Sequence, residues 1–184
     1  VEDSCRELDR VLAEKPTALV VCGEVFGLSD GDIATAATML KKAGHEVAWL
    51  DGIAEEWSPE TLSDRLAAFA PDVVVLETKT PVVKRHWAWI AAFKATHPAR
   101  AAKVVLVGDH VTALPDETME NCPVDYVLTG GDWDFLLLNL VSSGFDPARF
   151  EPGIWYRGGN TGRFRLDHDL KTTPWIDRDL CRWR

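Results

Sequence analysis

The chain of 184 residues has a formal net charge of -9, with 46% hydrophobic and 27% charged residues. This composition is typical of a globular domain with a packed core, and the acidic excess argues against nucleic acid as a partner. No apolar run reaches the ~18 to 20 residues of a membrane span and no signal peptide is evident, so we expect a cytoplasmic protein without a membrane partner.

Short apolar runs, several of them rich in valine, recur along the chain. Residues that are apolar at successive positions are typical of strands buried on both faces, as in a parallel sheet covered by helices. We therefore predict five parallel strands. They correspond to residues 18–22, 47–50, 73–76, 104–107 and the more mixed 124–128.

The first two predicted helices have clear end signals. The first covers residues 33–43, and Gly44 is placed to end it with a left-handed cap. Ser58 is an N-cap and Pro59 a first-turn proline for the second helix. Its predicted buried stripe is Leu62, Leu66 and Phe69.

The third predicted helix buries Val83, Trp87, Ile90 and Phe93, whereas Trp89 falls off that stripe. Two more helices are expected. A short one begins at Pro115, and another covers residues 132–142.

Strands and helices thus alternate five times, which predicts an α/β fold with right-handed crossovers. We expect a flavodoxin-like, Rossmann-like doubly wound parallel sheet with the strand order 2-1-3-4-5. Residues 1–15 are predicted to form a leading helix.

After Gly144 the pattern changes. Residues 152–157 and 163–166 are strand-like segments on either side of a glycine-rich turn, which predicts a small β-hairpin. From residue 167 to 184 no periodicity is visible, so we expect an extended linker.

Ligands of open parallel sheets bind beyond the carboxyl ends of the strands. Gly108, Gly130 and Gly131 follow predicted strands and would admit a flat ligand or a phosphate, while Thr78 and Thr80 offer hydroxyl groups. The predicted ligand loops are residues 23–31, 78–81, 108–115 and 129–132.

Asp109 and His110, directly after the fourth strand, first suggest catalysis or metal binding. His110 has no second ligand nearby in sequence, so we interpret it as a hydrogen-bonding residue of a pocket rim. Asp109 either orients His110, caps the next helix or faces solvent. The cysteines lie far apart and are interpreted as reduced, structural thiols; they are Cys5, Cys22, Cys122 and Cys181.

The order of these motifs resembles the N-terminal cobalamin-binding domain of B12-dependent radical S-adenosylmethionine (SAM) enzymes. The resemblance covers nearly the whole chain, and residues 174–180 resemble that family's linker into its radical domain. The segments that carry it are residues 78–81, 108–110 with 113–115, 124–127 with 130–132, and 152–157.

The resemblance implies that the loops bind cobalamin and present its corrin face to a radical SAM domain, in cis or in trans. With the leading helix predicted over 1–15, we expect a cobalamin-binding domain over 16–150, and the hairpin and linker over 151–184. The implied cofactor-binding residues are Val25, Phe26, Gly27, Thr78, Thr80, Pro81, Gly108, Asp109, His110, Leu114, Gly130, Gly131 and Asp132.

Some family features are replaced or absent. Asp109 stands where relatives usually have proline, and Asp132 stands near a glutamate position. The Asp-x-His-x-x-Gly signature of methionine synthase and mutase domains, whose histidine ligates cobalt, is missing from residues 29–33. We therefore expect base-off cobalamin without a histidine lower ligand and no cobalt ligand from the protein.

The Cys-x-x-x-Cys-x-x-Cys motif of a radical cluster is also missing from the sequence. A 4Fe-4S cluster and SAM would then belong to another part of a longer enzyme or to a partner. The domain alone is expected to carry a methyl group or electrons without turnover. The complete enzyme is expected to be a radical SAM methyltransferase or a related oxidoreductase.

Two other functions remain open at this point. A receiver domain has the same fold but needs an acidic cluster, a phosphorylatable aspartate and a lysine at strand ends. Here Glu24, the segment 77–79 and the segment 129–131 occupy those places and match poorly. Half of a sugar-nucleotide or flavin enzyme would also use glycines at strand ends.

Overall fold

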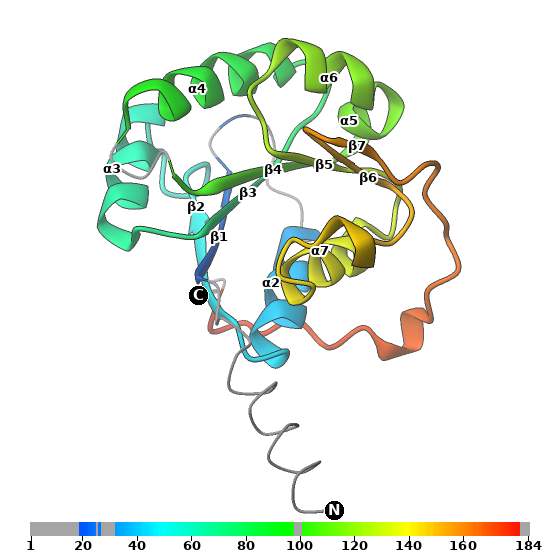
Figure 1. Ribbon diagram of the computed structural model, residues 1–184. Helices are drawn as coiled ribbons and strands as arrows, with labels where there is room; N and C mark the ends of the chain where they lie inside the picture. The colour runs from blue at the N-terminus through cyan, green and yellow to red at the C-terminus, as the bar shows by residue number, and fades with distance from the viewer. Residues whose placement is uncertain (1–18, 25, 27–31, 98–100, 181–184) are drawn as a thin grey trace, which may run out of the picture.

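The computed structural model describes residues 19–24, 26, 32–97 and 101–180 (Figure 1). They form one sheet with the strand order β2-β1-β3-β4-β5-β6-β7. Strands β1 to β5 are parallel, and β6 and β7 are antiparallel. The predicted order 2-1-3-4-5 is confirmed, and a hairpin extends it. The strands are β1 (Leu19–Glu24), β2 (Glu46–Asp51), β3 (Val73–Glu77), β4 (Lys103–Val107), β5 (Tyr126–Leu128), β6 (Ile154–Tyr156) and β7 (Gly159–Asn160).

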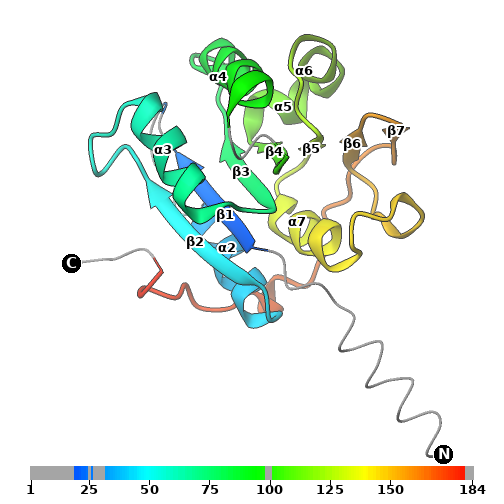
Figure 2. The same ribbon diagram turned by 60° about the vertical axis from the view of Figure 1, so that its left-hand side comes forward.

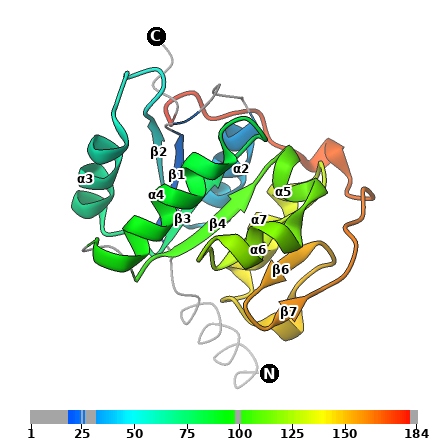
Figure 3. The ribbon, with the colours of Figure 1, turned by 90° about the horizontal axis from the view of Figure 1, so that it is seen from above.

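Helices cover both faces of this sheet (Figures 1 and 2). One face carries α2 (Asp32–Lys42) and α7 (Trp133–Ser142). Helices α3 (Pro59–Phe69) and α4 (Val83–Thr96) lie on the other face, together with the short α5 (Asp109–Ala113) and α6 (Pro115–Asn121). Figure 3 shows this second layer from above, with the hairpin at one end of the sheet and α3 at the other.

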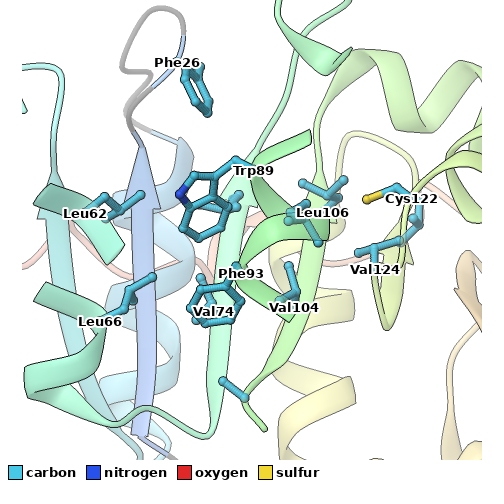
Figure 4. Close-up of a cluster of buried hydrophobic side chains, with 14 of the residues drawn as sticks. Phe26, Leu62, Leu66, Val74, Trp89, Phe93, Val104, Leu106, Cys122 and Val124 are labelled. Atoms are coloured by element: carbon cyan, nitrogen blue, oxygen red, sulfur yellow. The ribbon is translucent and has the colours of Figure 1, made fainter. Parts of the chain in front are cut away.

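Strand β3 shows why its residues are apolar at successive positions. Val73 and Val75 pack in the core shared with α2 and α7, whereas Val74 and Leu76 pack in the core shared with α3 and α4 (Figure 4). All of these side chains are fully buried. Burial on both faces removes the polar alternation of a half-exposed strand.

The predicted helix ends are confirmed where they can be checked. The hydroxyl of Ser58 accepts a hydrogen bond from the backbone N–H of Thr61 at 3.2 Å, and Pro59 is the first residue of α3. Gly44, after α2, has φ +92°, the left-handed backbone that favours glycine. These local signals place the ends of α2 and the start of α3.

The predicted buried stripe of α4 is wrong at Trp87 and leaves out Trp89 and His86. Trp89 is buried, and its indole N–H donates to the carbonyl of Pro59 at 3.2 Å and to the Ser63 hydroxyl at 3.1 Å. Trp87 is only half-buried. The stripe instead includes His86, whose polar ring a search for apolar residues passes over. In α3, Phe69 is 40% exposed, so it lies outside the stripe as well.

Two further details differ from the prediction. Residues 109–113, expected in a loop, form α5 directly after β4. The second hairpin strand is Gly159–Asn160, and residues 163–166 have no strand structure. Phe164 turns inward over Gly153 instead of continuing the ladder. The predicted leading helix of residues 1–15 lies outside the described residues.

Arg157 ties the hairpin to the end of α6. Its guanidinium donates to the carbonyl oxygens of Met119 at 2.8 Å, Val124 at 3.0 Å and Cys122. These carbonyls lie at or after the carboxyl end of α6, where backbone acceptors lack helical partners. A single side chain thus joins the antiparallel extension to the parallel part of the sheet.

Among the described residues, none of the helices combines the length and the apolar character needed to cross a bilayer. Cys122, the cysteine whose side chain is described, is buried and is a free thiol. Burial raises the pKa of this thiol to about 11. It is therefore a packed thiol, as the sequence analysis expected.

We predict that Arg157→Met lowers the free energy of unfolding by about 2 kcal/mol, because charged hydrogen bonds are lost and carbonyl groups are left unsatisfied. Urea unfolding measures this change. Arg178→Met is the matched control, because Arg178 is exposed, and should change stability by less than about 0.5 kcal/mol. Equal losses in the two variants would contradict the role assigned to Arg157.

Candidate functional site at the carboxyl edge of the sheet

The loops after β3 and β4 are joined at the carboxyl edge of the sheet. The backbone N–H of Thr78 donates to the carbonyl of Val107 at 2.9 Å. Farther along the same loop, the hydroxyl of Thr80 lies 3.2 Å from Nδ1 of His110. The structure therefore brings together Thr78, Thr80 and His110, which the sequence assigned to two separate loops.

Gly108 is required by the backbone of its neighbour. It has φ +109°, and a Cβ atom at this position would lie 2.5 Å from the carbonyl oxygen of Thr78. From the sequence alone, Gly108 was interpreted as making room for a ligand. The structure adds an internal reason, since the two strand ends meet too closely for any side chain.

The buried ring of His110 offers one polar atom at this edge. His110 is 7% exposed, and its Nε2 lies 3.8 Å from Oε2 of Glu117, which is too far for a hydrogen bond. Within the described part of the chain, this buried nitrogen has no hydrogen-bond partner. The ring of Trp87 packs against the ring of His110 in a T-shaped arrangement, with 5.9 Å between the ring centroids. Buried polar atoms nearly always have a partner, so the Nε2 atom of His110 is an exception at this edge.

The first predicted loop is described only at Phe26, while Val25 and Gly27 lie outside the described residues. Phe26 is 6% exposed. Its ring contacts the ring of His86 at 5.0 Å in a T-shaped arrangement, and the guanidinium of Arg85 lies 4.5 Å from its centroid. Phe26 is therefore held against the start of α4.

The loop after β5 is covered by the chain's own later residues. A Cβ atom on Gly130 would lie 2.6 Å from the ring of Phe164, and one on Gly131 would contact Leu166 at 3.7 Å. The backbone N–H of Gly130 also donates to the hydroxyl of Thr112 at 3.1 Å. Gly130 thus makes room for Phe164, a reason that the sequence did not reveal.

Asp132 has a partner that sequence reasoning missed. Its Oδ2 lies 3.0 Å from Nδ1 of His168, and Nε2 of the same ring lies 2.9 Å from Oε2 of Glu151. The ring also stacks on Phe135 at 4.5 Å. His168 stands in no recognisable motif, so only the folded chain reveals that it joins these two carboxylates.

The pKa of His168 follows from these contacts. Burial opposes the charged imidazolium, but the hydrogen bonds to Glu151 and Asp132 outweigh burial and raise the pKa above its ordinary value of 6.5. Both ring nitrogens face carboxylate oxygens, so the doubly protonated ring can donate to both. The charged form of His168 is therefore the one that hydrogen-bonds both Asp132 and Glu151.

Exposure divides the predicted cofactor-binding residues into two groups. The exposed group is available to a ligand, and it consists of Thr80, Pro81, Asp109, Leu114 and Gly131. The buried group supports the edge from below, and it consists of Phe26, Thr78, Gly108, His110 and Gly130. Asp132 lies between these extremes. In the described part of the chain, no cluster of histidine, cysteine and acidic residues is arranged to hold a metal ion.

We predict that Gly108→Ala destabilises the fold more than Gly44→Ala does. Both glycines have positive φ, but nothing lies within 4 Å of a Cβ atom on Gly44. Strain alone should cost about 1 kcal/mol in Gly44→Ala, and the added clash in Gly108→Ala about 2 kcal/mol more. Urea unfolding of both variants measures the difference, and similar losses would contradict the close contact with Thr78.

We also predict that the contribution of His168 to stability depends on pH. Its pKa is raised by folding, so the stabilisation is fully present below the ordinary pKa of 6.5 and is lost as the pH rises through the raised value. Between about pH 6 and about pH 9, the free energy of unfolding measured with urea should fall less for His168→Gln than for the unchanged chain. The same loss in both proteins would refute this assignment.

Comparisons with known proteins connect this geometry with a family. The family model described as the B12 binding domain matches residues 28–133. An uncharacterized methyltransferase of Pyrococcus horikoshii is 28% identical over 111 residues, which are 60% of this chain and 24% of that protein. The residues that the family model matches include the loops after β3, β4 and β5.

Two solved structures share the fold. The radical SAM methyltransferase TsrM from Kitasatospora setae, with cobalamin and a 4Fe-4S cluster bound, has a TM-score of 0.65 and 20% identity, covering 86% of this chain and 31% of that chain. The cobalamin-dependent SAM radical enzyme OxsB, with aqua-cobalamin bound, has a TM-score of 0.71 and 14% identity, covering 92% and 25%. The chain thus spans less than a third of the length of each of these three proteins.

These findings do not favour a receiver or half of a sugar-nucleotide or flavin enzyme. The family match extends over more than half of the 184 residues and includes the edge described above. The chain belongs to the B12-binding domain family.

Proposed function

We propose that the chain is the cobalamin-binding module of a larger B12-dependent radical SAM enzyme. The observation that carries the proposal is the family match over residues 28–133, which includes the joined loops at the carboxyl edge. The solved structures of TsrM and OxsB support the radical SAM context, because both are radical SAM enzymes with cobalamin bound. The bound cofactor would supply a cobalt centre that carries a methyl group or electrons.

The described residues would hold cobalamin from one side. Thr80 and Asp109 offer polar groups at the exposed rim, and Leu114, 47% exposed, offers an apolar surface to the corrin ring. The ring of His110, whose Nδ1 lies 3.2 Å from the Thr80 hydroxyl, would hold this rim in place from below. The buried Thr78 and Gly108 keep the strand ends in place beneath it.

The lower face of the cobalt would have no histidine ligand from the loop after β1. Residues 29–33 contain no histidine, whereas domains of the methionine synthase type carry theirs in this loop. His86, which comes from α4, is fully buried. We therefore propose that the bound cofactor is base-off.

Catalysis would depend on parts outside this sequence. A 4Fe-4S cluster and SAM would be supplied by a radical domain in cis or in trans, because the cluster motif is missing here. The methyltransferase names of the Pyrococcus relative and of TsrM favour methyl transfer over other radical chemistry. The module alone would bind its cofactor without turnover.

The test is reconstitution with hydroxocobalamin, followed by gel filtration and a visible spectrum. We expect the protein fraction to retain a base-off spectrum. Leu114→Asp should weaken retention about tenfold by placing a charge against the apolar corrin. Leu170→Asp is the matched control, because Leu170 is 65% exposed and lies in the later segment.

A colourless protein fraction after reconstitution of the unchanged chain would overturn the proposed function. A histidine-ligated spectrum would overturn the base-off assignment alone. Equal weakening by Leu114→Asp and Leu170→Asp would show that Leu114 does not face the cofactor.

A further inference from the structure

The first turns of α4 contact residues of the predicted cofactor edge. Arg85 and His86 contact Phe26 from the loop after β1. His86 also contacts Thr78 from the loop after β3, and Trp87 contacts His110 from α5. Consecutive residues of one helix thus reach elements that follow three different strands.

His86 is central to these contacts. It is 0% exposed, and its Nδ1 lies 2.9 Å from the hydroxyl of Thr78. The same ring contacts Phe26 at 5.0 Å with an interplanar angle of 87°. One side chain therefore joins the loop after β1 to the loop after β3.

Thr78 transmits this contact to the rim. Its N–H donates to Val107 at 2.9 Å, and its carbonyl oxygen lies against Gly108. Two residues later, Thr80 lies at hydrogen-bond distance from His110. A shift of Thr78 would thus disturb both Gly108 and Thr80. Thr78 itself is 1% exposed, so it supports the edge from within.

The ring of His86 is neutral at ordinary pH. Burial lowers its pKa to about 4, and the nearby positive charge of Arg85 acts in the same direction. A neutral imidazole can hydrogen-bond the Thr78 hydroxyl without the cost of a buried charge. The contact therefore persists over the pH range in which cofactor binding would be measured.

We propose that His86 is a positioning residue for cobalamin, which acts by holding Thr78, in the loop after β3, and Phe26 in place at the edge of the sheet. The inference rests on the proposed function. A residue that served only the core would affect stability and leave the affinity of the folded protein unchanged. A positioning residue must affect affinity, and it must do so through its partners.

A double-mutant cycle tests this coupling. His86→Phe keeps a ring against Phe26 but removes the polar atom that faces Thr78, and Thr78→Val removes the hydroxyl while keeping the branched shape. The Kd for hydroxocobalamin is measured by visible absorbance, with urea unfolding in parallel. We expect each single variant to weaken binding about tenfold, and the double variant to bind no more weakly than either.

Two further variants complete the test. His86→Asn can restore a polar atom near the Thr78 hydroxyl and should recover most of the affinity. His97→Leu, at the far end of α4, is the control and should leave Kd unchanged. If His86→Phe does not fold, His86→Leu takes its place in the cycle with Thr78→Val, because it also removes the polar atom that faces the Thr78 hydroxyl.

The possible failures are distinguishable. If the unchanged chain retains no cobalamin, the proposed function fails. If the unchanged chain binds but the effects on Kd add, or stability falls while Kd stays constant, only the role of His86 fails.

Discussion

Burial of the sheet on both faces is the constraint on which the rest of the structure depends. Helices α2 and α7 cover one face, and α3, α4, α5 and α6 cover the other, so neither face of the sheet is open to a ligand. The parallel strands all end at the same edge, where their loops meet. The carboxyl edge is therefore where we propose that the cofactor binds, as in other open α/β sheets. The packing that makes the fold stable also determines where a cofactor would bind.

Much of this architecture could be predicted because its causes are local. Runs such as residues 73–76 must be apolar throughout when both faces are buried, and Ser58 and Gly44 act within one helical turn. The prediction failed where a distant contact decides the structure. Trp89 lies at helical spacing from His86 and Phe93, and α3 supplies the hydrogen-bond acceptors that satisfy its buried indole N–H, which the sequence of α4 does not reveal.

The same distinction applies to the site. The glycines and threonines at strand ends were visible in sequence, and the structure joins several of them by hydrogen bonds. Their separation into exposed and buried groups was not visible, because it depends on how the loops pack together. His86 was hidden by its polar character, although its spacing from Val83 and Ile90 places it on the buried stripe. His168 lies 36 residues from Asp132 in sequence, so only folding brings them together.

The position of Asp132 links ligand binding at the edge of the sheet to release of the segment that includes His168. Its carboxylate is shared between the edge of the sheet and the segment that includes His168, and this segment continues to α2, where Lys41 pairs with Asp177 at 2.6 Å (Figure 1). Any ligand that donates a hydrogen bond to Oδ2 of Asp132 would compete with His168. By thermodynamic reciprocity, release of the segment would then favour that ligand to the same extent as the ligand favours release.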